Sequence, residues 1–232
     1  MVTLRLRAAF GGLLVALTLP LAGTLINAML SMPASAAVTQ AAASAGDTQL
    51  VQQIAAKLAQ ASGIRAQFTQ TQTLSAMSRP LVSSGWLVFS RERGVIWQID
   101  TPYKATWVIT DTGVNQVDAN GQRVKTSQPQ QGARGVAQVS KMMRAMLGGD
   151  LSALYSQFDV DAQGSASQWK LELKPNQPQL AQAIKGLQME GGDYLKTLRI
   201  TLANGDVTQI EFTGSKAVDE LQPSERALLG VK

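Results

Sequence analysis

The chain contains neither cysteine nor histidine among its 232 residues. Without cysteine there is no disulfide framework, so a folded domain must rely on its hydrophobic core alone. A lipid-modified lipoprotein is excluded too, because that anchor is built on a cysteine thiol. Without histidine, the chain cannot use histidine-dependent triads, histidine zinc sites or imidazole acid–base catalysis. Most routes to hydrolytic catalysis are therefore closed, and we expect no catalytic residue, metal or cofactor.

Charge is also scarce, because only 16% of the residues are charged and the net charge is +5 without any Lys/Arg run. That balance argues against a nucleic-acid partner. Ser167 and Lys170 match the S-x-x-K pattern of some serine acyltransferases, which need both groups on one helical face. Here the pattern enters an alternating strand, which separates the hydroxyl from the amine. Asp159 and Asp161 share a face, but their setting is typical of a solvated loop rather than a carboxylate dyad.

The N-terminal segment differs from the rest of the chain. Arg5 and Arg7 precede an uncharged run over residues 8–37 that closes on the small-x-small pattern Ala34-Ser35-Ala36. This pattern predicts a secretory signal over residues 1–36, although its long apolar region leaves an uncleaved membrane anchor open. Cleavage would lower the net charge from +5 to +3. We expect a flexible, Ala/Ser/Thr-rich stretch at residues 37–46 and a single domain at residues 47–232.

Residues 85–102 carry the clearest pattern, two apolar strands around a charged turn. Alternation places Leu87, Phe89 and Arg91 on one face of the first strand, and Val95 and Trp97 on one face of the second. A buried guanidinium without partners is costly, so Arg91 must reach solvent or find acceptors. The pattern therefore suggests an apolar cavity with one polar fastening.

Period-two patterns recur along most of the chain, and tight turns follow one another. Asp47 is a candidate N-cap for a helix whose apolar residues lie at helical spacing up to Leu58. Further helical segments are predicted at residues 136–147, 151–158 and 224–229, and Asn120-Gly121 predicts a hairpin. The predicted strands are residues 64–74, 85–91, 95–99, 104–110, 114–117, 122–126, 169–174, 184–190, 195–202 and 207–212.

These elements predict a mainly β (α+β) fold. About ten to eleven antiparallel strands would form an unclosed β-barrel or strongly curved sheet with a helical lid. The lid would be the central helix, which carries Met142, Met146 and Leu147 on one broad face. That face suits either ordinary core packing or a deformable surface for variable apolar ligands, because methionine is unbranched and polarizable.

The sequence resembles the LolA-type family of periplasmic lipoprotein carriers. The resemblance rests on Phe68-Thr-Gln70, the series from Gly85 through Leu87 and Phe89 to Arg91, and then Trp97 and Pro102, in that order. It covers roughly residues 47–214. Two departures stand out: Glu92 occupies a position that is usually proline, and the family's C-terminal apolar strand is not recognisable in residues 217–232.

The resemblance implies a monomer in the periplasm of a Gram-negative bacterium that holds the acyl chains of lipoproteins in an apolar cavity under a lid. Its partners would be an inner-membrane lipoprotein-release complex and an outer-membrane acceptor. The family's lid-fastening arginine falls on Arg91. The cavity would be lined by apolar residues of the strands and the lid, namely Phe68, Leu87, Phe89, Val95, Trp97, Ile99, Trp107, Ile109, Met142, Met146 and Leu147.

Three alternatives remain open. The same fold could carry another exported lipid or glycolipid, or act as a lipid-sensing module that signals through a partner. An enzyme acting on lipid or glycan is disfavoured by the missing histidines.

Overall fold

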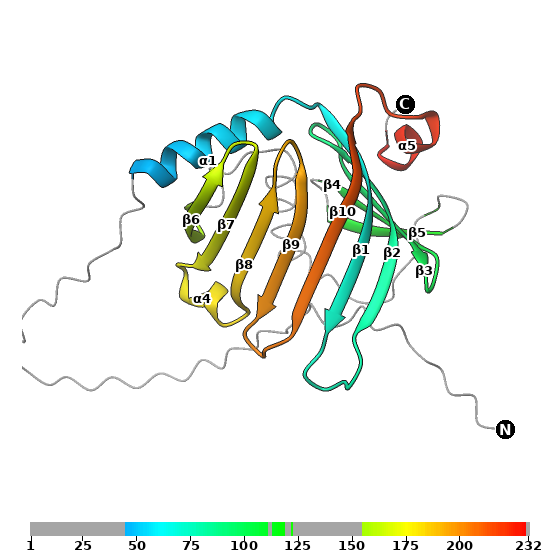
Figure 1. Cartoon of the computed structure of the whole chain (residues 1–232). Helices are drawn as coiled ribbons and strands as arrows, with labels where there is room; N and C mark the ends of the chain where they lie inside the picture. Colours follow the sequence, from blue (N-terminus) through cyan, green and yellow to red (C-terminus); the bar gives the residue numbers. More distant parts are fainter. Residues whose placement is uncertain (1–44, 111–112, 119–121, 123–154, 231–232) are drawn as a thin grey trace, which may run out of the picture. The chain divides into compact units, whose positions relative to one another are not determined.

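Ten strands of the described residues form one antiparallel sheet in the order β5-β4-β3-β2-β1-β10-β9-β8-β7-β6 (Figure 1). The computed structural model describes residues 45–110, 113–118, 122 and 155–230. Edge strands β5 and β6 do not pair with each other, so the sheet is not closed into a barrel. The predicted fold class, a mainly β unclosed curved sheet with a helix, is confirmed.

The sheet has two halves that meet at its centre. The N-terminal half-sheet is β1 (Gly63–Thr73), β2 (Leu81–Ser90), β3 (Gly94–Thr101), β4 (Ala105–Thr110) and β5 (Gly113–Val117). The C-terminal half-sheet is β6 (Phe158–Ser165), β7 (Gln168–Pro175), β8 (Ile184–Gly191), β9 (Leu195–Leu202) and β10 (Val207–Ala217). β1 pairs with β10, so the first and last strands of the chain form the middle of the sheet.

Three helices accompany the sheet in the described part of the chain: α1 (Ala45–Leu58), α4 (Pro178–Ala181) and α5 (Pro223–Leu228). α1 begins two residues before the expected cap at Asp47. α5 confirms the helical turn predicted near the C-terminus, and it begins with a capping box formed by Gln222 and Glu225. Among the described helices, none is long and apolar enough to span a membrane.

One strand was missed by the sequence analysis. The helix predicted over residues 151–158 is wrong at its end, because Phe158 opens β6. In β6 the buried residues Phe158 and Val160 alternate with the exposed Asp159 and Asp161, which is the period of a strand with one solvated face. The predicted strand at residues 122–126, apart from Gln122, and the predicted central helix lie outside the described residues.

Two glycines let β2 and β3 approach their neighbours closely. At Gly85 a Cβ atom would lie 1.9 Å from the Gln98 carbonyl oxygen, beside an irregularity in the β2–β3 register. Gly94 begins β3 with a positive φ of 125°, which favours glycine, and a Cβ there would lie 2.0 Å from the Ile109 carbonyl oxygen. Glycine is therefore required by close backbone contact both within β2, at Gly85, and at the end of the predicted turn, at Gly94.

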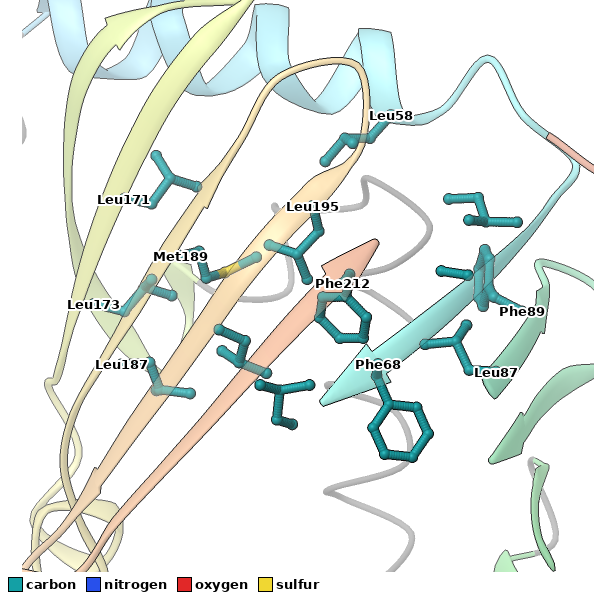
Figure 2. Packing of buried hydrophobic residues seen from close by; sticks show 14 of the residues in the cluster. Leu58, Phe68, Leu87, Phe89, Leu171, Leu173, Leu187, Met189, Leu195 and Phe212 are labelled. Carbon is teal, nitrogen blue, oxygen red and sulfur yellow. The ribbon is translucent and has the colours of Figure 1, made fainter. Parts of the chain in front are cut away.

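The α1 face of the sheet is its larger apolar surface (Figure 2). Every strand except β5 contributes buried side chains to one cluster on this face, and Val51, Ile54 and Leu58 of α1 join it. Leu171, Leu187 and Met189 show that the cluster continues across the C-terminal half-sheet.

A second, smaller cluster lies on the opposite face, which we call the α5 face. It contains Val88, Ile96, Val108 and Val117 of the N-terminal half-sheet, covered by Leu229 after α5. The partly buried Trp86, Leu221 and Leu228 pack against it. β2, β3 and β4 are therefore apolar on both faces, which explains the near-continuous apolar runs in their sequences.

Candidate functional site

The α1-face cluster has an aromatic centre where the two half-sheets meet. The rings of Phe68 (β1) and Trp97 (β3) are stacked with centroids 3.9 Å apart and an interplanar angle of 29°. Phe212 (β10) meets Trp97 edge to face, with centroids 6.4 Å apart. Such rings present a large, rigid apolar surface, which suits contact with a ligand that has no polar groups to recognise.

The structure brings the predicted cavity residues of the strands together on this face. The eight residues are Phe68, Leu87, Phe89, Val95, Trp97, Ile99, Trp107 and Ile109; all are buried except Trp107, which is partly buried against the cluster. The three predicted lid residues, Met142, Met146 and Leu147, lie outside the described residues.

α1 covers one end of this surface. Its buried residues Val51, Ile54 and Leu58 point into the cluster, and the helix packs against β6. A small, partly open apolar cavity of about 10 Å³ lies under the C-terminal end of α1, lined by Leu58, Ile64, Ala66, Leu87, Tyr194, Leu195, Phe212 and Ser215. Its volume is close to that of one water-sized sphere. An acyl chain does not fit in it unless the walls move apart.

Arg91 fastens the C-terminal end of α1 to the turn between β2 and β3. Its guanidinium donates hydrogen bonds from Nη2 to the carbonyl oxygens of Ala59 at 2.6 Å and Ala61 at 2.9 Å. We call these contacts the Arg91 latch. The last carbonyls of a helix lack partners within the helix, and a cation there also interacts favourably with the helix dipole. The predicted need for acceptors is met by backbone carbonyls just beyond α1.

The position of Arg91 differs in one respect from the alternation argument. β2 ends at Ser90, so Arg91 lies in the turn and is exposed rather than aligned with Leu87 and Phe89 over the apolar surface. Its backbone N–H donates to the Ser62 carbonyl at 3.0 Å, which brings the turn against the start of β1. The latch is therefore accessible to solvent and lies beside the apolar surface.

A second polar contact holds α1 from the C-terminal half-sheet. Lys57 Nζ lies 2.6 Å from Asp193 Oδ1 in the turn between β8 and β9. This hydrogen bond and the charge of Lys57 hold the pKa of Asp193 below its usual range. Both side chains are accessible to solvent, so the pair is weak on its own. α1 is thus tied at its end to both half-sheets by contacts that solvent can replace.

An open groove of about 530 Å³ lies on the solvent side of the latch. It runs between the α1–β1 turn, the β2–β3 turn and the segment before α5, and its charged residues are Arg91, Glu92, Arg93, Asp219, Glu220 and Arg226. Its positive and negative side chains are equal in number, so the groove favours neither anionic nor cationic ligands. It does show that the latch can be reached from outside.

The other motifs of the sequence do not form sites. Lys170 in β7 pairs with Glu172 at 3.4 Å and with Glu190 at 3.9 Å, while the Ser167 hydroxyl bonds to that of Ser165. The S-x-x-K pattern thus brings no amine to the serine. Within the described residues, no group of three or more acidic, cysteine or histidine side chains is placed to hold a metal ion.

The predicted cavity residues include none from the C-terminal half-sheet, although its side chains contribute to the same apolar surface. Leu171, Met189, Leu195 and Phe212 line the same face, and Tyr194 and Leu195 border the small cavity. Alternation in β7, β8 and β10 marked these residues as one face of each strand. What it could not show is that this face joins that of β1–β4, because the pairing of β1 with β10 has no local signal.

A family model described as "Outer membrane lipoprotein carrier protein LolA-like" matches residues 40–225. No curated protein sequence matches the chain significantly.

Solved structures with similar folds include a LolA superfamily protein from Nitrosomonas europaea, with 7% identity over 78% of this chain and 96% of that chain, and a TM-score of 0.42. LprF from Mycobacterium bovis has 13% identity over 78% of this chain and 97% of that chain, with a TM-score of 0.40. A chain of the Pseudomonas aeruginosa MucA/MucB complex has 13% identity over 78% of this chain and 60% of that chain, with a TM-score of 0.44.

Proposed function

The chain belongs to the LolA-like family of outer membrane lipoprotein carrier proteins, and we propose that it carries lipoprotein acyl chains through the periplasm on its α1 face. It would accept them from an inner-membrane release complex and deliver them to an outer-membrane acceptor. Another exported lipid is the alternative cargo for the same surface. The N-terminal signal predicted from residues 1–36 supports export.

The observation that carries this proposal is the position of the small cavity. It lies under Leu58, the last residue of α1. The Arg91 latch bonds to the carbonyl oxygen of Ala59, the next residue of the chain. Releasing the latch would let this end of α1 lift away from Leu87, Leu195 and Phe212, which line the cavity. The structure then represents the closed form, in which the apolar surface is covered by the protein itself.

The magnitudes explain why a carrier would have such a cover. Burying a CH₂ group contributes about 0.8 kcal/mol, so an acyl chain with ~14 of them gains on the order of 11 kcal/mol. A carrier that gained all of this would not release its cargo. A helix that competes for the same surface lowers the net affinity. A hydrogen bond from a charged group contributes roughly 1.5–3 kcal/mol, which biases opening by about ten- to a hundredfold.

Arg91→Leu tests the latch. Without the guanidinium the open form gains population, so we expect a fluorescent fatty acid to bind about ten- to a hundredfold more tightly and to leave more slowly. Arg93→Leu is the matched control, because Arg93 is an exposed arginine of the same turn and makes no ion pair in the described part of the chain. Unchanged binding and release in Arg91→Leu would exclude the latch while leaving the carrier proposal standing.

Native mass spectrometry of protein recovered from the periplasm tests the carrier proposal itself. We expect a co-purifying lipid or lipoprotein, whose mass identifies the cargo. Absence of bound lipid together with no uptake of a hydrophobic dye would contradict the carrier. Incubation with acyl substrates separates a carrier from an enzyme, because a carrier forms no product.

A further inference from the structure

One polar side chain is buried within the α1 face. Gln70 of β1 is only 8% exposed, and in the described part of the chain it shares such burial of a polar side chain only with Glu225, which is paired with Arg65. The carboxamide of Gln70 can donate two hydrogen bonds and accept two, yet it makes none in this part of the chain. A buried polar group without a partner lowers stability, so its presence calls for an explanation.

The strand register places Gln70 beside the aromatic centre. It follows Phe68 by two residues, so both side chains lie on the same face of β1. The residues directly opposite are Ile210 of β10, which belongs to the α1-face cluster, and Ser83 of β2. Ser83 is half-buried, and within the described residues its hydroxyl makes no hydrogen bond either. Two polar groups without partners are therefore neighbours on the surface that we assign to the cargo.

This polar pair and the small cavity under α1 lie on opposite sides of the aromatic centre. Ala66 lines the cavity, and Gln70 follows four residues later, which is roughly 13 Å along a strand that rises about 3.3 Å per residue. Phe68 lies between them and stacks on Trp97. A hydrocarbon chain laid along β1 would therefore have an apolar path from the cavity over Phe68 and a polar end at Gln70.

We propose that Gln70 recognises the polar end of the cargo, by donating a hydrogen bond from Nε2 to the carbonyl oxygen of an acyl group in ester or amide linkage. The inference rests on the proposed function and assigns an orientation to the cargo: the carbonyl at Gln70 and the tail over Phe68 toward α1. Ser83 offers a second donor beside it. The ligand supplies the partner that the folded chain lacks, so the carboxamide favours an acyl chain over a plain hydrocarbon.

Gln70→Met tests this assignment, because methionine is also unbranched and flexible but has no amide. Gln67→Met is the matched control, since Gln67 is an exposed glutamine of the same strand on the opposite face. Displacement of an uncharged hydrophobic dye measures the binding of a medium-chain methyl ester, the N-methylamide of the same chain and an alkane of similar length. We expect Gln70→Met to bind the ester and the amide about three- to tenfold more weakly and the alkane no more weakly. The larger of the two losses identifies the linkage.

Two further measurements separate recognition of a ligand from a role in folding. The infrared stretch of an isotope-labelled ester carbonyl falls in frequency when the oxygen accepts a hydrogen bond, so we expect a lower frequency in the unmodified chain and in Gln67→Met than in Gln70→Met. In urea denaturation without ligand, Gln70→Met should be at least as stable as the unmodified chain, because it removes a buried amide that has no partner.

The outcomes distinguish this assignment from the carrier proposal. Equal binding of ester and amide by Gln70→Met and the unmodified chain, with the same carbonyl frequency, would overturn the role of Gln70 and leave the carrier standing. A marked loss of stability in Gln70→Met would also overturn it, since the glutamine would then be needed for the fold. If the unmodified chain bound none of the three probes, the carrier proposal would fail and this assignment with it.

Discussion

The two half-sheets are alike on the α1 face, where both bury apolar side chains, but they differ on the opposite face. In the C-terminal half-sheet the second face carries Asp159, Gln188 and Glu211, all exposed to water. In the N-terminal half-sheet the second face carries Val88 and Ile96, whose side chains are fully buried. A sheet that faces water on one side needs one cover, whereas a sheet that is apolar on both sides needs two.

The second cover comes from the C-terminal segment. Glu225 of α5 is buried and pairs with Arg65 of β1 at 2.5 Å, and its other oxygen accepts the backbone N–H of Gln222 at 2.7 Å. The hydroxyl of Ser62 and the backbone N–H of Val218 add bonds between this segment and the start of β1. The C-terminal segment thus covers the α5 face. It is the same segment in which the apolar strand usual for the family is not recognisable.

The largest expected effect comes from Ile96→Ala. Truncating this fully buried side chain leaves a cavity under the C-terminal segment, and we expect a loss of about 2–5 kcal/mol in the free energy of unfolding. Gln188→Ala, at an exposed position in the C-terminal half-sheet, should change it by less than about 0.5 kcal/mol. Urea denaturation measures both. Similar losses for the two variants would show that the α5 face is not a second core.

Glu225→Ala is expected to have an intermediate effect. It removes the partner of Arg65 and the cap of α5, and a hydrogen bond to a charged group contributes about 1.5–3 kcal/mol. We therefore expect a loss of about 2 kcal/mol and stronger binding of a hydrophobic dye at the uncovered α5 face. Glu220→Ala is the control, an exposed glutamate of the same segment. If both variants behaved alike, the C-terminal cover would not depend on this pair.

The smallest expected effect concerns the link between the two half-sheets formed by Ser75 in the β1–β2 turn and Asp206 in the β9–β10 turn. The backbone N–H and then the hydroxyl of Ser75 hold the pKa of Asp206 below its usual value. A lowered pKa in the folded state contributes stability above the ordinary carboxyl pKa, and the contribution is lost as the pH falls through the folded-state value. Asp206→Asn should therefore be less stable than the unmodified chain at neutral pH, and the difference should shrink below about pH 4.

Asp159→Asn provides the comparison for this pH dependence. Asp159 is exposed in edge strand β6, so Asp159→Asn should differ little from the unmodified chain in its free energy of unfolding. A pH-independent deficit in Asp206→Asn would mean that the amide disturbs the turn for reasons other than charge.

Much of the α1 face could be predicted, because alternation is a local property. Leu87, Phe89, Val95 and Trp97 lie on the predicted face, since a strand with a period of two can hide only every second side chain behind one cover. β6 was missed because Asp159 and Asp161 resemble a solvated loop when they are considered apart from Phe158 and Val160.

The rest depends on contacts between distant parts of the chain. Trp86 and Val88 also alternate, but nothing near them indicates that Leu228 and Leu229 cover their face. Alternation showed that the Arg91 guanidinium needs acceptors, yet it could not identify them. The acceptors are backbone carbonyls of Ala59 and Ala61, and a carbonyl oxygen is the same for every residue type.

The pairing of β1 with β10 also bears on how fast the chain folds. Ser62 and Val218, which bond beside this pair, are 156 residues apart in sequence. Rates fall as contacting residues become more distant along the chain, because a long loop must close before the contact stabilises anything. Each half-sheet can form hairpins early, but β1 can pair with β10 only after the last strand has been synthesised. We therefore expect a chain that is still emerging from synthesis to lack the pairing of β1 with β10, and so to remain in the unfolded form that the proposed export requires.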